Sequence, residues 1–182
     1  LSRDCKDDAD VTVRITAAGN AFGALRASLF TSVSICFSAK RLVYNGLILP
    51  ILLYGADSWC LTEKLFNKLC LFHERCVSAI CRVNRLHTRE HRITTVELLQ
   101  RVGLRSMDSS VTKCQLRWAG HVARMDHERI PRKMLTSWVH SKRPRGCPEF
   151  TYGRGVVKAL KKVHVDKRQW ISLAQNRDEW RK

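Results

Sequence analysis

Residues 62–82 read TEKLFNKLCLFHERCVSAICR, and this stretch decides the kind of fold that the chain adopts. Thr62 is a favoured residue for capping the start of a helix. Apolar side chains then recur at the three- or four-residue spacing of one helical face. That stripe comprises Leu65, Leu69, Phe72, Cys76 and Ile80, and the opposite face holds Lys64, Lys68, Glu74 and Arg75. The pattern predicts a long amphipathic helix over 63–82.

The same spacing continues on both sides of this helix. It predicts helices over 10–30, over 39–49 with Ser38 as its cap, and over 108–125. Pro50 predicts a kink, with the helix continuing toward Gly55. Thr94 and Glu97 stand at the spacing of a capping box, and Gly103 closes the short helix that they open. Further helices are predicted over 130–139, 156–162 and 166–175, and residues 84–92 are predicted to be a polar, basic connection.

The domain organisation follows from a change in composition near residue 141. Residues 142–148 read KRPRGCP, a basic stretch interrupted by two prolines and a glycine, which is typical of an extended linker. We therefore expect an all-α fold in three parts. These are a helical region over 1–140, a basic Pro/Gly linker over 141–150 and a small helical region over 151–182.

The charge of the chain indicates its class of partner. Lys and Arg total 33 against 16 Asp and Glu, which gives a net charge of +17. The isoelectric point is about 10.1 and the mean hydropathy is −0.25. Such an excess favours a polyanion, most often nucleic acid. A membrane surface is a lesser alternative because no single helix is both basic on one face and strongly apolar on the other. A basic protein that its charge merely keeps soluble is the remaining alternative.

Several basic clusters are candidates for contacts with a phosphate backbone. We expect such contacts to position the backbone without reading its sequence, and to weaken steeply with salt. The candidate residues are Lys40, Arg41, Arg82, Arg85, Arg89, Arg92, Arg117, Lys142, Arg143, Arg145, Lys158, Lys161 and Lys162. Lys167 and Arg168 extend the last cluster.

Metal binding and catalysis have weaker support in the sequence. The eight cysteines include no Cys-x-x-Cys pair. The best candidate cluster is Cys70, His73, Cys76 and Cys81, for which a buried helical face is the favoured interpretation. Asp7 and Asp8 are the only adjacent aspartates, and no apolar strand pair surrounds them. We therefore expect no catalytic residue, no metal or other cofactor and no small-molecule ligand in this chain.

Apolar runs, the N-terminal pattern and the cysteines indicate the cellular compartment of the protein. The longest apolar run, 47–54, is too short to cross a bilayer and contains Pro50. Because the N-terminus lacks the pattern of a signal peptide, we expect free thiols and an intracellular protein of the nucleus or cytoplasm, not a secreted one. Trp118 and Trp170 lie on apolar helical faces, which favours packing in a core over stacking on bases. The role of Trp59 stays open.

In order, the motifs of this chain resemble the region after the catalytic palm in non-LTR (LINE-type) retrotransposon endonuclease–reverse transcriptases. The most specific block is 116–125, LRWAGHVARM, which looks very like the tryptophan–glycine–histidine block of that family. The other matching residues include 40–45 (KRLVYN), 49–55 (LPILLYG), Ser58-Trp59, Arg129-Ile130-Pro131, 142–146 (KRPRG) and Trp180-Arg181. The sequence departs from the family at Cys147, where relatives tend to keep a basic residue.

The resemblance implies a helical, thumb-like bundle that holds template and primer, an RNA–DNA hybrid, beside a palm domain. The palm of the family carries an aromatic-x-Asp-Asp motif and its magnesium ions, and that motif is missing here. The implied role is therefore nucleic-acid binding without polymerase or nuclease activity. Two alternatives remain, a retained enzymatic activity, and a free-standing helical interaction protein or non-functional remnant of an element.

Overall fold

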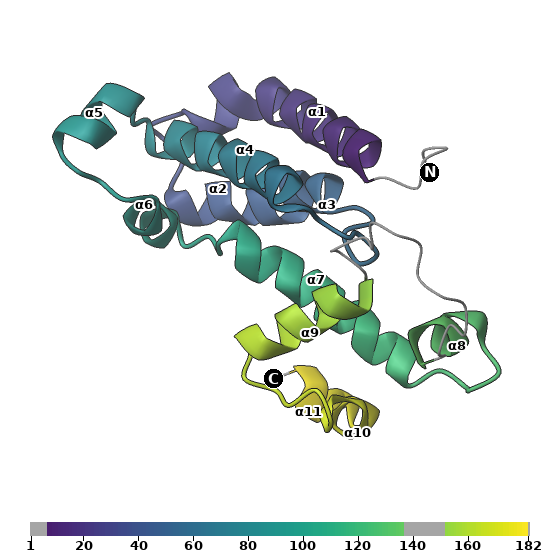
Figure 1. Cartoon of the computed structure of the whole chain (residues 1–182). Coiled ribbons are helices and arrows are strands. Elements are labelled where there is room, and N and C mark those ends of the chain that lie inside the picture. Colours follow the sequence, from purple (N-terminus) through teal and green to yellow (C-terminus); the bar gives the residue numbers. More distant parts are fainter. Residues whose placement is uncertain (1–6, 137–151, 182) are drawn as a thin grey trace. The chain divides into compact units, whose positions relative to one another are not determined.

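The computed structural model describes residues 7–136 and 152–181, and this part of the chain is helical with no strand (Figure 1). The predicted all-α class is confirmed. None of the described helices has the length and apolarity that crossing a membrane requires. The elements in chain order are α1 (Asp8–Leu25), the π-helix η1 (Arg26–Phe30), α2 (Phe37–Val43), the π-helix η2 (Tyr44–Ile48), α3 (Leu49–Leu52), α4 (Glu63–Cys81), α5 (Arg85–Glu90), α6 (Thr95–Val102), α7 (Met107–Ala123), α8 (Ile130–Thr136), α9 (Tyr152–Lys162), α10 (Trp170–Gln175) and α11 (Arg177–Arg181).

The chain divides into two compact units. The first comprises residues 1–54 and 62–111, and the second comprises residues 55–61 and 112–182, so that the division falls inside α7. This division differs from the expected boundary at residue 141. The expected linker over 141–150 lies outside the described residues.

The core of the first unit forms where α1 packs against α3 and α4, and α6 packs against α4 and α2 (Figure 1). Phe22 and Phe30 stack with ring centroids 4.4 Å apart, and the ring of Tyr44 meets each of them edge-on. Offset stacking and edge-on contacts are the arrangements that aromatic rings prefer. Tyr44 also contacts the ring of His73 on α4, with ring centroids 5.6 Å apart, and Leu65, Leu69 and Ile80 of the same helix are buried.

The predicted kink at Pro50 takes the form of a widened turn. The helix that begins at Phe37 continues through η2 and α3 to Leu52. The N–H group of Leu49 donates to the carbonyl of Tyr44, five residues back. A π-turn of this kind shifts the hydrogen-bond ladder just before Pro50, which has no N–H group to donate. The helix therefore passes the proline and ends before the left-handed Gly55.

The helix caps read from the sequence are confirmed at α4 and α6. The Thr62 side chain accepts a hydrogen bond from the Leu65 N–H group, as expected for the start of α4. Thr94 and Glu97 form the reciprocal capping box. Gly103 ends α6 with φ of 76°, a left-handed conformation that favours glycine.

Two local predictions were wrong. Ser38 does not cap the second helix, because α2 begins at Phe37, two residues earlier than predicted, and no side chain caps it. The expected connection over 84–92 contains helix α5, whose cap is Asn84. The Asn84 side-chain oxygen accepts from the His87 N–H group at 2.7 Å. Asparagine is a favoured N-cap residue, so Asn84 could have predicted the start of α5. The polar composition of the segment suggested a connection instead.

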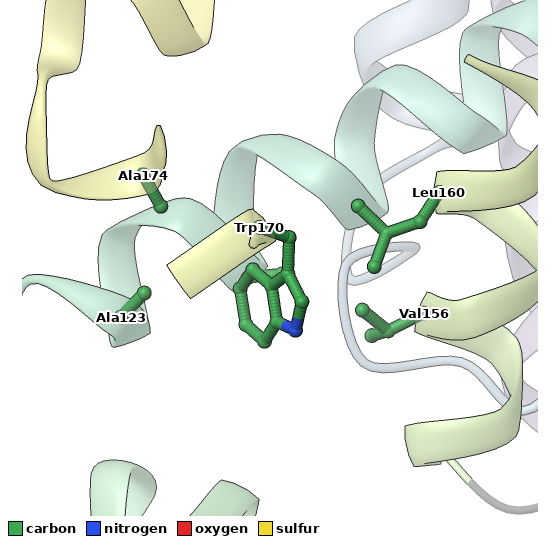
Figure 2. Close-up of a cluster of buried hydrophobic side chains, with 6 residues drawn as sticks. Ala123, Val156, Leu160, Trp170 and Ala174 are labelled. Atoms are coloured by element: carbon green, nitrogen blue, oxygen red, sulfur yellow. The ribbon is translucent and has the colours of Figure 1, made fainter. Parts of the chain in front are cut away.

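The second unit has its own core, built on Trp170 of α10 (Figure 2). Val156 and Leu160 of α9 and Ala123 of α7 join Trp170 in this cluster. Trp170 is 8% exposed, so its predicted place in a core is confirmed. Two side-chain hydrogen bonds tie α10 to α7, from Arg124 to the Ala174 carbonyl at 2.6 Å and from Gln175 to the Ala123 carbonyl at 2.9 Å. Trp118 is only partly buried, and Trp59, whose role was open, is 2% exposed.

Candidate nucleic-acid interface

The basic segment 82–92 of the first unit is held in place by two left-handed arginines. Arg82 ends α4 with φ of 57°, and Arg92 ends α5 with φ of 50°. At the end of α4, the Arg82 N–H group donates to the Ala79 carbonyl and the Val83 N–H group donates to the Ser78 carbonyl. At the end of α5, the Arg92 N–H group donates to the Arg89 carbonyl and the Ile93 N–H group donates to the Thr88 carbonyl. This pattern is the Schellman motif, in which glycine is the usual left-handed residue.

Arginine at these two positions costs folding energy that glycine would not. A residue with a side chain in the left-handed region costs of order 1 kcal/mol. Arg82, Arg89 and Arg92 are all exposed, and none of them forms a salt bridge with a described carboxylate. The fold therefore holds two guanidinium groups at helix C-termini, where the helix dipole favours a cation, and leaves them in solvent. The Arg85 side chain lies outside the described part of the structure.

The second unit carries a basic face on α9. Val156, Ala159 and Leu160 of this helix are buried. The exposed side carries four cations and the helix contains no acidic residue; the cations are Arg154, Lys158, Lys161 and Lys162. Residues 154, 158 and 161 follow one another at helical spacing and span about 10 Å along the axis. Spacing of this kind lays a row of positive charge along one side of the helix.

A second basic face in this unit lies on α7. Lys113, Arg117 and His121 are exposed and stand four residues apart, one above the next on the helix surface. Burial raises the pKa of Asp57, and the nearby guanidinium of Arg117 lowers it again in part. Arg117 was among the contacts predicted from the sequence, and Lys113, His121 and Arg154 were not. Their spacing of four from Arg117 and from Lys158 was the signal that could have found them.

Lys40 and Arg41, also candidates, have roles inside the first unit. Lys40 is 3% exposed, and its ammonium group donates to the Ser32 carbonyl at 2.7 Å. A buried lysine requires such a partner. The Lys40 ammonium group is therefore engaged inside the first unit and is not a candidate for contact with a phosphate. Arg41 is exposed, and its guanidinium occupies the space beside Gly103 that a side chain would fill. Lys142, Arg143 and Arg145 lie outside the described residues.

The cysteine–histidine cluster is not assembled as a metal site. Within residues 7–136 and 152–181, no group of three or more His, Cys, Asp or Glu side chains is placed to hold a metal ion. Both ring nitrogens of His73 have partners, the Tyr44 hydroxyl at 2.8 Å and the Arg105 carbonyl at 3.0 Å. Burial raises the pKa of the Cys76 thiol to about 12, and also raises the pKa of Cys81. A metal ligand would have to be a thiolate, which burial disfavours here.

Asp7 and Asp8 lie at the start of α1. Asp7 precedes the first turn and Asp8 is within it. Carboxylates at this end of a helix interact favourably with its dipole. This placement gives both residues a structural role at the start of α1.

Comparison with known proteins gives one distant relative. No family model matches the chain, and no solved structure matches it. The relative is an uncharacterized transposon-derived protein of Caenorhabditis elegans, 25% identical over 166 residues, which are 88% of this chain. The match covers 59% of the length of that protein. This chain is therefore distantly homologous to a transposon-derived protein.

Proposed function

We propose that this chain is the nucleic-acid-binding segment of a retrotransposon reverse transcriptase, which holds template and primer beside a palm domain and performs no catalysis itself. The observation that carries the proposal is the pair of strained arginines, Arg82 and Arg92. The fold bears a backbone cost at two positions whose exposed guanidinium groups form no salt bridge with a described carboxylate, and a bound anion would offset that cost. The basic faces of α7 and α9 and the net charge of +17 support the same class of ligand.

The ligand is an RNA–DNA hybrid or a related duplex that is bound through its phosphates. Exposed arginines and lysines at helical spacing neutralise a phosphate backbone without reading bases. The resemblance of residues 116–125 to the retrotransposon block and the transposon-derived relative support the reverse-transcriptase origin. Magnesium would belong to the palm, and no role for it falls to this chain.

The proposal is tested by binding of the full chain to a fluorescent RNA–DNA hybrid across a salt series. We expect the logarithm of affinity to fall linearly with the logarithm of salt concentration, with a slope of about −0.9 for each phosphate neutralised. A folded chain that does not bind the hybrid at low salt would overturn the proposal.

The two strained arginines make a sharp test, because stability and binding should change in opposite directions. In Arg82→Gly/Arg92→Gly, glycine removes the backbone cost, so we expect the free energy of unfolding to stay level or rise by about 1 kcal/mol. The salt slope should fall by about 1.8, for two lost phosphate contacts. Lys64→Gln/Lys68→Gln on α4 removes the same charge outside the segment and should change the slope less. Equal slopes for the two double variants would contradict the role of Arg82 and Arg92.

The face of α9 is tested in the same assay. Lys158→Gln/Lys161→Gln/Lys162→Gln keeps three exposed, helix-compatible side chains and removes three charges, so the fold should be retained. We expect the salt slope to fall by about 2.7. An unchanged slope would show that α9 does not contact the hybrid.

A second candidate function, a helical protein-interaction role, has one observation in its favour. Several large apolar side chains are exposed, among them Leu42 at 75% and Val33 at 81% in the first unit. Ile130 and Met134 stand four residues apart on α8 and are 72% and 78% exposed. Such side chains often mark contact with another protein. Stable folding without binding of the hybrid would leave this candidate in front.

A further inference from the structure

A groove in the first unit has no role in the proposal above. It lies between α4, α5 and α6, with Arg26 of η1 at its edge, and its volume is about 430 Å³. Pockets that bind small molecules measure about 300–1,000 Å³. The groove is therefore large enough for one small ligand or for one unit of a polymer.

The lining of the groove has two chemical parts. Leu71, Ile93 and Leu98 contribute apolar surface, and Ser78 and Thr95 contribute hydroxyl groups. A lining that combines apolar side chains with hydrogen-bonding groups suits a flat, partly polar ring. The apolar part buries the faces of such a ring, while the hydroxyl groups can bond to its edge.

The charge at the groove favours an anion. Arg26 and Arg75 line it and are exposed to solvent, against one carboxylate, Glu74. One wall is α5, which belongs to the basic segment 82–92. A ligand that joins a flat ring to a phosphate would meet both the apolar lining and the guanidinium groups.

We infer that this groove holds one unpaired nucleotide of a bound strand, with the base against Leu71, Ile93 and Leu98 and the phosphate at Arg26 and Arg75. The inference rests on the proposed function and names a site within it. An apolar peptide with an acidic residue is the competing ligand. The nucleotide is favoured because the basic segment beside the groove would carry the adjoining phosphates of the same strand.

The experiment compares a blunt RNA–DNA hybrid with the same hybrid carrying a four-nucleotide single-stranded overhang. We expect the overhang to raise the affinity of the full chain about fivefold, which corresponds to burying about 40 Å² of apolar base surface at about 25 cal/mol per Å². Arg75→Gln removes a guanidinium from the groove. Ala79 also lines the groove, so Ala79→Phe fills it with a ring. Both variants should lose most of the overhang gain, and Ala79→Phe should keep the affinity for the blunt hybrid.

The matched control is Lys68→Gln, which removes the same charge two turns away on the same face of α4 and does not line the groove. It should keep the overhang gain. Arg75 is exposed, so Arg75→Gln tests the groove even if the larger ring of Ala79→Phe disturbs folding. An overhang gain that is absent from the wild type, or that both groove variants keep, would overturn the inference.

Binding of adenosine monophosphate separates this inference from the proposed function. Ligand-observed NMR should detect the mononucleotide on the wild type and not on Ala79→Phe, and inorganic phosphate should compete only weakly. That result would support the groove even if the hybrid did not bind. An overhang gain that an acidic apolar peptide removes and the mononucleotide does not would overturn the inference in favour of a protein ligand.

Discussion

Replacing His73 by leucine is expected to lower the free energy of unfolding by about 1–3 kcal/mol, because the change leaves the buried Tyr44 hydroxyl without its histidine acceptor and the part-buried Arg105 carbonyl without its donor. His73 is 2% exposed. Its Nε2 lies 3.0 Å from the Arg105 carbonyl, which can only accept, so Nε2 carries the proton. The neutral ring then accepts at Nδ1 from the Tyr44 hydroxyl, at 2.8 Å. Denaturant unfolding monitored by circular dichroism measures this decrease in the free energy of unfolding.

The double variant Tyr44→Phe/His73→Leu is the matched control. It removes the hydroxyl together with its acceptor, so we expect it to recover part of the stability that the single change loses. If His73→Leu alone were as stable as the wild type, the network of Tyr44, His73 and the Arg105 carbonyl would have no structural role.

The same histidine should make stability depend on pH. Burial lowers the pKa of His73, and the smaller effect of the Arg105 carbonyl opposes this shift. Below the ordinary histidine pKa of about 6.5, the unfolded chain takes up a proton that the folded chain resists. Stability from this group is therefore complete above about pH 6.5 and falls as the pH drops toward the lowered pKa of the folded state. His73→Leu should show a smaller fall over that range.

Replacing Gly120 by alanine is expected to lower the free energy of unfolding by about 1–3 kcal/mol, the usual cost of overpacking. A Cβ atom on Gly120 would overlap the indole ring of Trp180. That ring donates from Nε1 to the Leu116 carbonyl at 3.0 Å and lies 6.1 Å from the ring of Trp170. The alanine would displace Trp180, and both contacts would weaken.

The sign of this effect should reverse when Trp180 is absent. Glycine inside a helix is about 1 kcal/mol less favourable than alanine. In a Trp180→Ala background, Gly120→Ala meets no indole and should stabilise α7 by about that amount. A double-mutant cycle measured by denaturant unfolding tests the reversal. Destabilisation in both backgrounds would show that Gly120 is required for a reason other than Trp180.

The sequence alone determined the features that depend on neighbours along the chain. Apolar residues at helical spacing located α1, α4 and α7, because a helix buries one face. Thr62, the pair Thr94 and Glu97, and Gly103 set the ends of α4 and α6, because capping groups act within a few residues of the helix end that they satisfy. The basic segment 82–92 was visible for the same reason, although its helix α5 was not.

Features that depend on residues distant in the sequence became visible only in the folded chain. The sequence suggested that Lys40 is a surface cation, but in the folded chain Lys40 is buried and donates to the Ser32 carbonyl. His73 was a possible metal ligand until Tyr44 and the Arg105 carbonyl took both of its nitrogens. Gly120 sits beneath Trp180, sixty residues later in the chain. In each case the side chain has one chemistry but several possible partners. The sequence fixes the chemistry, and packing, which brings distant groups within hydrogen-bond or van der Waals distance, selects the partner.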